Sequence, residues 1–321
     1  MTIAEMDNGV YAYGGHAVPV ENLSLHPGVH SLHYASTCFE GLKAHRQIDG
    51  SLAIFRVDDH VSRMMQSIKR LNMEPPTADL IRSMIIDAVE ANAEATPVSP
   101  GSLYIRPTMI GTLLNIGAAA APSDSALLYV LTSPVGDYFA GGIRPLSIYV
   151  ETQTPRTTPQ FGMVKSGANY AMALGPTLEA KQKYGADQVL FATGGDVTET
   201  GASNFFLVDD NRIVTRQLDE SFLHGVTRAS ILTLAADLGY EVEERLVTIE
   251  ELKDWATRGE AFLSGTAAVV APVGQVTIGG ESITVGDGQP GANTLRLRKM
   301  LTDIQVGAGE DLHSWCTPVK G

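Results

Sequence analysis

A segment dense in turn-forming residues divides this chain near its middle. Residues 133–142 read Ser-Pro-Val-Gly-Asp-Tyr-Phe-Ala-Gly-Gly, and Pro, Gly, Ser and Asp favour turns over helices and strands. A chain of 321 residues is long enough for two domains. We therefore predict a small domain over residues 1–136, an interdomain loop over 137–143 and a larger domain over 144–321.

Both halves mix helical and strand patterns. Val61, Met64 and Ile68 recur at helical spacing behind an Asp-Asp pair, which predicts a helix over residues 58–72. Further helices are predicted over 77–93, 169–183, 226–238 and 293–305, with a short one after the capping box that begins at Thr248. The principal predicted strands are 9–13, 17–19, 35–45, 52–55, 102–110, 126–132, 146–151, 189–192, 204–208, 213–215, 261–263 and 269–273.

The charge balance excludes two classes of partner. The chain has 23 Lys and Arg against 36 Asp and Glu, a net charge of −13, which argues against non-specific binding to nucleic acid or to an anionic membrane surface. A small anionic substrate remains open, because a few arginines and helix N-termini are enough to bind a carboxylate or a phosphate.

The remaining composition signals indicate a cytoplasmic protein without metal. Cys38 and Cys316 have no zinc-type spacing, so we expect two free thiols in a reducing compartment. Residues 1–9 lack the basic flank and apolar run of a signal peptide, and no apolar stretch is long enough to span a bilayer. His30 and His33 lack acidic neighbours, so no metal site is expected.

Lys165 stands among small residues, in the sequence Lys-Ser-Gly-Ala-Asn-Tyr. Small neighbours let a planar ring approach closely, and desolvation with a nearby cation can lower the pKa of an amine. Most other lysines fall on predicted helices with polar neighbours. Lys165 is therefore the candidate for a Schiff base with an aldehyde such as pyridoxal phosphate, although on chemistry alone a plain loop lysine is an equal alternative.

Two more side chains suit the same chemistry. Tyr170 follows Lys165 by five positions, and its hydroxyl can bond the O3′ of a pyridoxal ring. Glu199 follows a predicted strand, and its carboxylate can keep a pyridine nitrogen protonated, which makes the ring an electron sink.

Three segments could hold a phosphate. Gly225-Val226-Thr227-Arg228 opens a predicted helix, whose free N–H groups and dipole suit an anion. Ser264-Gly265-Thr266-Ala267 could present a hydroxyl and backbone N–H groups, and Arg63 could add a cation. Taken singly, these are also an ordinary helix start, a Ser/Gly turn and a surface arginine.

Arg106 interrupts the apolar run Leu-Tyr-Ile-Arg-Pro-Thr at residues 103–108, in a strand that we expect to be largely buried. A guanidinium in such a strand requires an anion. That anion could be a ligand or, equally, a structural carboxylate.

Taken together, these segments resemble the fold-type IV pyridoxal phosphate enzymes, and most of all the branched-chain amino acid aminotransferases. Short motifs carry the resemblance along nearly the whole chain, in the family's order and spacing. They are residues 33–41 (His-Tyr-Ala-Ser-Thr-Cys-Phe-Glu-Gly), 104–107 (Tyr-Ile-Arg-Pro) and 134–139 (Pro-Val-Gly-Asp-Tyr-Phe), then the segments of Lys165, Glu199, Gly225 and Ser264.

The resemblance implies an α+β fold, with a small N-terminal α/β domain and a larger C-terminal pseudo-barrel domain. It implies Lys165 as the catalytic lysine, Tyr170 at O3′ and Glu199 at the ring nitrogen of pyridoxal 5′-phosphate. It places Arg63, Thr266 and the backbone of Val226 and Thr227 at the phosphate, Leu223 against the ring and Asn204 near it. The implied substrate pocket consists of Tyr34, Phe39, Gly41, Tyr104, Arg106, the backbone of Ala267 and, across a homodimer interface, Tyr138.

The implied reaction moves the α-amino group of L-leucine, L-isoleucine or L-valine to 2-oxoglutarate. D-amino acid aminotransferase and aminodeoxychorismate lyase remain alternatives of the same fold type, and a non-catalytic cofactor-binding protein is the alternative from another class. The chain departs from residues common in the family at Val135, Met163, Ser166, Thr200 and Ser203. These departures affect the expected substrate preference and leave the chemistry unchanged.

Overall fold

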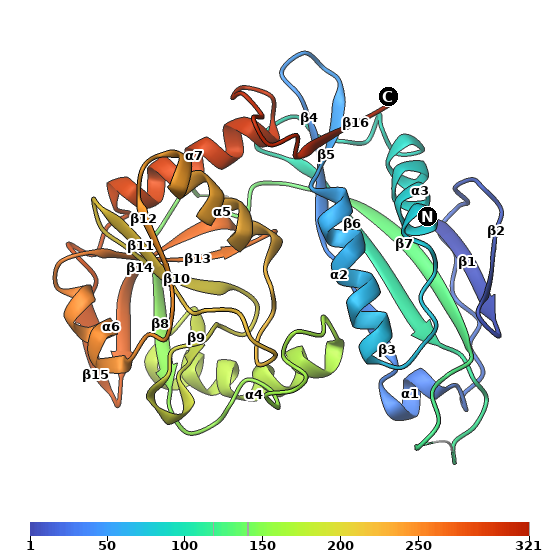
Figure 1. Cartoon of the computed structure of the whole chain (residues 1–321), viewed down its shortest axis with the longest axis horizontal. Coiled ribbons are helices and arrows are strands. Elements are labelled where there is room, and N and C mark those ends of the chain that lie inside the picture. The colour runs from blue at the N-terminus through green and yellow to red at the C-terminus, as the bar shows by residue number, and fades with distance from the viewer. Residues whose placement is uncertain (118, 140, 321) are drawn as a thin grey trace. The chain divides into compact units, whose positions relative to one another are not determined.

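The computed structural model describes residues 1–117, 119–139 and 141–320, and the chain forms two compact units (Figure 1). Unit 1 comprises Met1–Asp137, Val164–Ala168 and Ile304–Gly321, and unit 2 comprises Tyr138–Met163 and Asn169–Asp303.

The chain thus returns to unit 1 twice, once for the five residues around Lys165 and once at its C-terminal end. The predicted division into 1–136, 137–143 and 144–321 treats each domain as one continuous segment, and it stays a prediction. Ala140, inside the predicted interdomain loop, lies outside the described residues.

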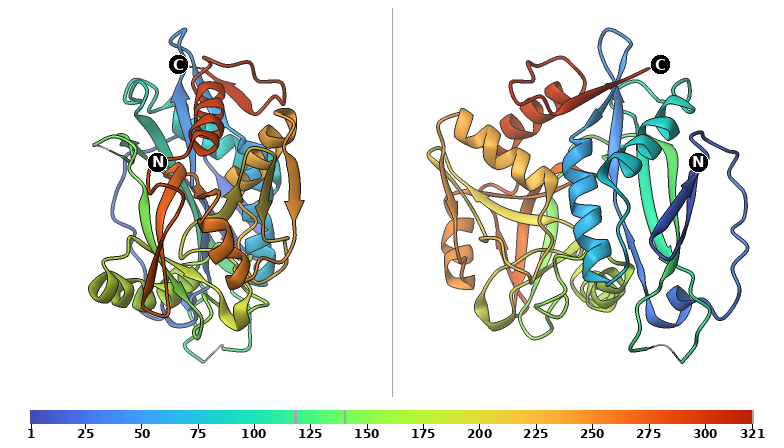
Figure 2. Two further views of the ribbon diagram at one scale, coloured as in Figure 1. Left: turned by 90° about the vertical axis from the view of Figure 1, so that its left-hand side faces the viewer. Right: turned by 45° about the vertical axis from the view of Figure 1, so that its right-hand side comes forward.

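Unit 1 is built on an eight-stranded antiparallel sheet in the order β16-β5-β4-β6-β7-β1-β2, with β3 paired to β6. The strands are β1 (Thr2–Asp7), β2 (Val10–Tyr13), β3 (Thr37–Phe39), β4 (Leu42–Arg46), β5 (Leu52–Phe55), β6 (Ser102–Gly111), β7 (Ser125–Val135) and β16 (Cys316–Val319). Its helices are α1 (His30–Tyr34), α2 (Val57–Arg70) and α3 (Ala78–Glu90). The apolar faces of α2 and α3 pack on one side of the sheet and form its core (Figures 1 and 2).

Strand β6 buries one of its two faces fully and the other in part. Leu103, Ile105 and Met109 are fully buried, whereas Arg106 and its alternate neighbours are half-buried. β6 is thus largely buried, as expected, and Arg106 lies on its less buried face, because successive side chains of a strand point to opposite faces.

Two predicted strands also differ from the structure. Residues 17–19 form no strand, and the predicted strand 35–45 is divided into β3 and β4 at Glu40 and Gly41. Ala35 adopts the left-handed conformation at the end of α1, with φ of 52°, which reverses the chain before β3.

Unit 2 contains an eight-stranded mixed sheet in the order β12-β11-β10-β13-β14-β8-β9, with β15 paired to β14. The strands are β8 (Leu146–Glu151), β9 (Gln188–Phe191), β10 (Asn204–Val208), β11 (Arg212–Thr215), β12 (Glu241–Glu244), β13 (Glu260–Gly265), β14 (Val269–Ile278) and β15 (Glu281–Thr284). The helices are α4 (Gly167–Tyr184), the 3₁₀ turn η1 (Thr193–Gly195), α5 (Val226–Asp237), α6 (Ile249–Ala256) and α7 (Ala292–Gln305). Thr248 caps α6 by accepting the Glu251 N–H at 3.1 Å, as the capping box predicts.

No helix in the described part of the chain is long and apolar enough to cross a membrane. The same residues contain no group of three or more His, Cys, Asp or Glu that could hold a metal ion.

Candidate active site

The predicted site residues fall into two groups, one in each unit. In unit 1 the centre of the group is Lys165, whose main chain is held from both sides. Its N–H donates to Ser67 Oγ at 3.1 Å, and its carbonyl accepts the Phe39 N–H at 3.0 Å. Its Nζ lies 5.2 Å from the centroid of the Phe39 ring, so the amine rests against an aromatic face.

Arg106 contacts the same aromatic ring. Its guanidinium carbon is 4.6 Å from the centroid of Phe39 and 5.2 Å from that of Tyr104, and its Nη2 donates to the Tyr104 hydroxyl at 2.8 Å. Arg106 Nε is buried without a hydrogen-bond partner among the described residues. A buried cationic donor that lacks an acceptor suits a ligand carboxylate, which favours the ligand interpretation over a structural ion pair.

Gly41 and Tyr34 differ in how they relate to this group. A Cβ atom at Gly41 would collide with the Tyr104 hydroxyl, so glycine is what allows Tyr104 its position beside Arg106. Tyr34 lies on α1, where its hydroxyl donates to the carbonyl of Ile116 and its ring contacts His30 at 4.9 Å. These contacts do not connect Tyr34 with Phe39, and its place in the substrate pocket stays a prediction.

Arg63 is a buried residue of α2, not a surface arginine. Its Nε and Nη2 donate to the two carboxylate oxygens of Glu40 at 2.7 and 2.8 Å. His60 donates from Nδ1 to the same carboxylate at 2.8 Å. Sequence reasoning singled out neither Glu40 nor His60, although Glu40 belongs to the motif at residues 33–41.

The electrostatics of this cluster follow from its burial. Burial alone would raise the pKa of Glu40, but the charge of Arg63 and the hydrogen bonds from Arg63 and His60 outweigh it and hold the pKa below its usual value. Burial lowers the pKa of His60, against the opposing effect of Glu40. Glu40 is thus an anion, and its charge and geometry fix the orientation of Arg63.

In unit 2 the group is built around Glu199, which is 1% exposed. Its Oε1 lies 2.7 Å from Arg156 Nη1 and accepts the Leu223 N–H at 3.0 Å. The guanidinium carbon of Arg156 is 5.8 Å from the ring centroid of Tyr170. A cation and a backbone donor stabilise the carboxylate form of Glu199, which is the form that a protonated ring nitrogen requires.

Sequence reasoning missed Arg156. It lies in the Pro- and Thr-rich loop before Lys165, where nothing nearby in the sequence indicates burial. Arg156 is recognised only in the structure, where its loop approaches Glu199, which lies 43 positions later in the chain.

Asn204 joins Glu199 to the two predicted phosphate segments of unit 2. Its Nδ2 donates to the carbonyl of Leu223 at 3.0 Å, it pairs with Ser264 across β10 and β13, and a Cβ atom at Gly225 would collide with its Oδ1. Gly225 caps α5 without a side-chain hydrogen bond, and Ser264 Oγ is buried with no hydrogen-bond partner in the part of the chain that the structure describes. An uncapped helix start and an orphaned hydroxyl suit an anion.

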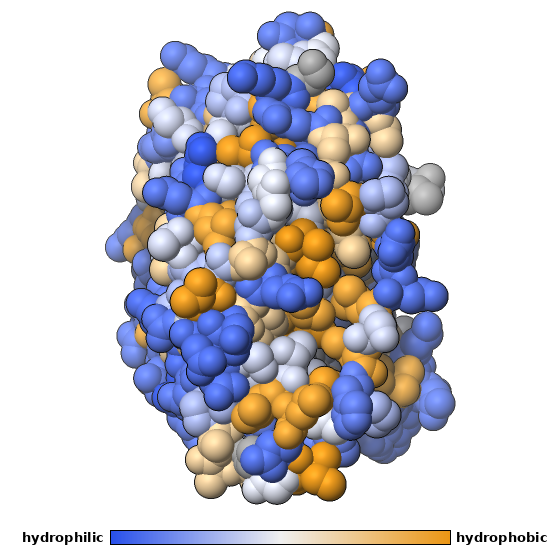
Figure 3. All heavy atoms as spheres, turned by 90° about the vertical axis from the view of Figure 1, so that its right-hand side faces the viewer, coloured by the Kyte–Doolittle hydropathy of each residue, from blue (hydrophilic) through white to orange (hydrophobic). Residues whose placement is uncertain are grey.

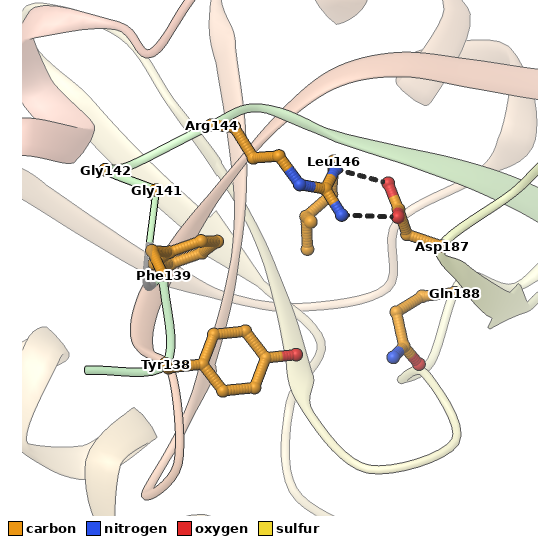
Figure 4. A pocket seen from close by; sticks show the side chains of 8 residues that line it. All are labelled: Tyr138, Phe139, Gly141, Gly142, Arg144, Leu146, Asp187 and Gln188. Carbon is orange, nitrogen blue, oxygen red and sulfur yellow. Dashed lines mark hydrogen bonds and ion pairs between the residues drawn. The ribbon is translucent and has the colours of Figure 1, made fainter. Parts of the chain in front are cut away.

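Tyr138 lies at the edge of a pocket of about 410 Å³ in unit 2 (Figure 4). Tyr138 is 52% exposed, and its ring packs edge-on against Phe139, with 5.0 Å between centroids. Phe139 is buried and anchors the loop. The opposite wall carries Arg144, whose guanidinium forms a bidentate pair with Asp187 at 2.7 and 3.0 Å.

Each group by itself suits a part of pyridoxal phosphate. Unit 1 has an amine against an aromatic face, and unit 2 has a buried carboxylate for a ring nitrogen and a helix start without a side-chain cap for a phosphate. The comparisons with known proteins agree. The family model of the class IV amino-transferases matches residues 37–276.

Curated relatives cover nearly the whole chain. A probable branched-chain-amino-acid aminotransferase of Streptomyces coelicolor is 42% identical over 314 residues, which is 94% of this chain and 85% of that protein. Branched-chain-amino-acid transaminase 1 of Bacillus subtilis is 36% identical and covers 99% of this chain and 91% of that protein.

Solved structures give the same result. The branched-chain amino acid aminotransferase of Thermobaculum terrenum in its PLP form has a TM-score of 0.80 at 25% identity and covers 100% of this chain and 98% of that chain. The enzyme of Escherichia coli has a TM-score of 0.79 at 26% identity and covers 99% of both chains.

The fold, the two residue groups and these matches define a class IV aminotransferase, an α+β enzyme of fold type IV that depends on pyridoxal 5′-phosphate. Within that class the chain belongs to the branched-chain amino acid aminotransferases. The resemblance that the motifs indicated is thereby confirmed.

Proposed function

We propose that this enzyme moves the α-amino group of L-leucine, L-isoleucine or L-valine to 2-oxoglutarate, giving a branched-chain 2-oxo acid and L-glutamate. The observation that carries this proposal is the contact of Arg106 with the rings of both Phe39 and Tyr104. An aromatic wall accepts an aliphatic side chain, and the orphaned Nε of Arg106 can bind the side-chain carboxylate of glutamate. One pocket can therefore serve both halves of the reaction.

Each predicted residue has a defined task in this proposal. The bound cofactor supplies the aldehyde that carries the amino group and the ring that accepts electrons. Lys165 would hold the cofactor through its amine until the amino group of the substrate displaces it, and the freed amine would then take the α-proton of the substrate and give a proton back. Glu199, paired with Arg156, would keep the ring nitrogen protonated, and the Tyr170 hydroxyl would donate to O3′.

Several groups are proposed to bind the phosphate. Arg63, oriented by Glu40, contributes the cation. The backbone N–H groups of Val226 and Thr227 at the start of α5 and the Thr266 hydroxyl contribute hydrogen bonds. Leu223 would pack on the ring beside Asn204, and the backbone of Ala267 would bind the substrate.

The proposal includes a homodimer in the cytoplasm. An exposed Tyr138 beside a buried Phe139 supports a loop whose outer aromatic residue meets another subunit. Figure 3 shows apolar residues gathered on the side of unit 1 that carries β1 and β2, and Leu32, Leu114 and Ile116 of this unit are 60–67% exposed. Two free cysteines suit a reducing compartment.

A substrate panel tests the proposal directly. Purified enzyme with 2-oxoglutarate should form L-glutamate from L-leucine, L-isoleucine and L-valine and should leave D-alanine unchanged. Turnover of D-alanine with no turnover of L-leucine would assign a D-amino acid aminotransferase, and pyruvate release from aminodeoxychorismate would assign the lyase. Cofactor binding without any turnover would assign a non-catalytic protein.

A further inference from the structure

Helix α2 carries three buried polar side chains on one face. His60, Arg63 and Ser67 are spaced by three and four residues, so they lie above one another on the helix surface. They are 3%, 7% and 1% exposed, beside an apolar stripe that includes Met64 and Ile68. Buried polar groups require partners, and the partners of these three side chains explain why the helix carries them.

The first two residues share one partner. Glu40 accepts hydrogen bonds from both His60 and Arg63, and this carboxylate orients the arginine.

The third residue has a different partner, the main chain of Lys165. Ser67 Oγ accepts the Lys165 N–H at 3.1 Å. Lys165 precedes the first residue of α4, Gly167, so helix hydrogen bonding does not supply an acceptor for this N–H. The Ser166 N–H donates to the Val164 carbonyl at 2.9 Å, which places Lys165 at the tip of a tight turn. Ser67 and the Phe39 N–H then fix that tip from two sides.

We propose that Ser67 is a positioning residue for Lys165. Its hydroxyl holds the backbone from which the lysine amine reaches the reacting atoms, and this rests on the proposed function, in which Lys165 is the cofactor-binding lysine. The amine must serve two positions, the cofactor aldehyde and the α-carbon of the substrate. Because a misplacement of about 1 Å can slow a reaction by about a hundredfold, a fixed backbone matters at this residue.

The placement of Ser67 has a second consequence. Ser67 follows Arg63 by one helical turn, so a single helix sets the spacing between the backbone of the lysine and the arginine proposed to bind the phosphate. A rigid helix keeps such a spacing more accurately than two separate loops would.

The test compares Ser67→Ala with Ser62→Ala. Ser62 is exposed on the same helix, so its substitution changes helix propensity equally and touches nothing at Lys165. Hydrogen exchange of residues 164–168 is measured in the full chain without cofactor, and kcat and KM for L-leucine are measured in the holoenzyme. Ser67→Thr keeps the hydroxyl and serves as the rescue variant.

Ser67→Ala should accelerate exchange at the Lys165 amide about tenfold and lower kcat about tenfold, the factor that loss of one ordinary hydrogen bond gives. KM should change less than about twofold, because substrate contacts remain. Ser62→Ala should change neither quantity, and Ser67→Thr should restore both toward wild type.

Unchanged exchange in Ser67→Ala would overturn the proposal, as would faster exchange with unchanged kcat. A loss of kcat that only follows a loss of bound cofactor would mark Ser67 as structural and would overturn it too. If Ser67→Ala does not fold, Ser67→Cys takes its place, because a thiol is of similar size and a weaker acceptor. The same changes in amide exchange and kcat are then expected, and the same results would overturn the proposal. Borohydride labelling of another lysine would instead refute the proposed function. The faster exchange of the Lys165 amide in Ser67→Ala would still be observed, so the two failures can be told apart.

Discussion

Glu40 holds Arg63 by two hydrogen bonds, of 2.7 and 2.8 Å, in the interior of unit 1. Both side chains are removed from water, at 1% and 8% side-chain exposure. Neither charge is stable there alone, since an uncompensated buried ion is strongly unfavourable. The fold of unit 1 and the orientation of its candidate phosphate-binding cation therefore depend on the same pair.

Glu40→Gln should destabilise unit 1 by about 3–5 kcal/mol, because Arg63 then remains charged and buried without its partner. The chain has two tryptophans, and Trp315 lies in unit 1, whereas Trp255 lies in unit 2. Urea unfolding followed by Trp315 fluorescence in a Trp255→Phe background therefore reports on unit 1.

The matched control for Glu40→Gln is Asp58→Asn. Asp58 pairs with Arg82 on the surface, where the two side chains are 72% and 38% exposed. Such a pair contributes about 1 kcal/mol or less. Equal losses for the two variants would contradict the assignment of Glu40 as the essential partner of a buried cation.

His45 makes unit 1 sensitive to acid. Burial and the nearby charge of Lys43 lower the pKa of His45 from 6.5 to about 3. The imidazole of His45 takes up a proton near pH 6.5 in the unfolded chain, but only near pH 3 in the folded chain. The free energy of unfolding should therefore fall as the pH decreases through this window, by up to about 1.4 kcal/mol per pH unit from this group.

His45→Leu removes the titrating group and should flatten that slope, as measured by urea unfolding between about pH 5 and pH 8, a range that brackets the unfolded-state titration. His60, whose pKa burial also lowers, contributes in the same direction, and its contribution remains in the variant. Glu40 adds to the slope mainly below this range, where the carboxyl of the unfolded chain takes up its proton. His16→Leu, at an exposed histidine, should leave the slope unchanged. A His45→Leu slope equal to that of wild type would show that His45 is accessible to protons in the folded state.

Arg106→Met should weaken glutamate and 2-oxoglutarate far more than leucine. The expected loss for the acidic pair is about 2–5 kcal/mol, as when one side of a desolvated charge pair is removed. Half-reaction kinetics with each amino acid measure the difference, and Arg106→Lys keeps the charge as a control. Equal losses for leucine and glutamate would instead make Arg106 a structural residue or a general binder of the α-carboxylate.

Tyr138→Ala should raise KM for amino acids and leave cofactor absorbance intact, because we place this ring over the active site of the neighbouring subunit. The decisive sample is a mixed dimer of Lys165→Ala and Tyr138→Ala subunits. If Tyr138 acts across the interface, the site with the intact lysine receives an intact tyrosine and keeps wild-type affinity. Weakened affinity at that site would show that the loop acts within its own chain.

Local patterns predicted the regular elements well. The periodicity of Val61, Met64 and Ile68 gave a helix within a residue or two of α2, and the capping box at Thr248 marked the start of α6. Local patterns did not predict elements that depend on backbone conformation or on a distant pairing strand. β16 exists because its residues pair with β5, more than 250 positions earlier in the chain, and no local signal records that pairing.

The candidate site shows the same division. Lys165 could be proposed from the sequence because it stands among small residues, and Glu199 because it follows a predicted strand. Both roles stay predictions. Glu40, His60 and Arg156 could not be proposed, because a buried polar side chain looks the same in sequence as an exposed one until its partner is known. Arg106 was singled out by its place in an apolar strand, and β6 is largely buried, with Arg106 on its less buried face.

The identity of the cofactor-binding lysine tests the central claim most directly. Borohydride treatment of the holoenzyme fixes the cofactor to the amine that holds it, and peptide mapping then locates the label. We predict that the label lies on Lys165, and that Lys165→Ala loses both the label and turnover of L-leucine. A label on Lys43 or on any other lysine, or turnover by Lys165→Ala, would contradict this account.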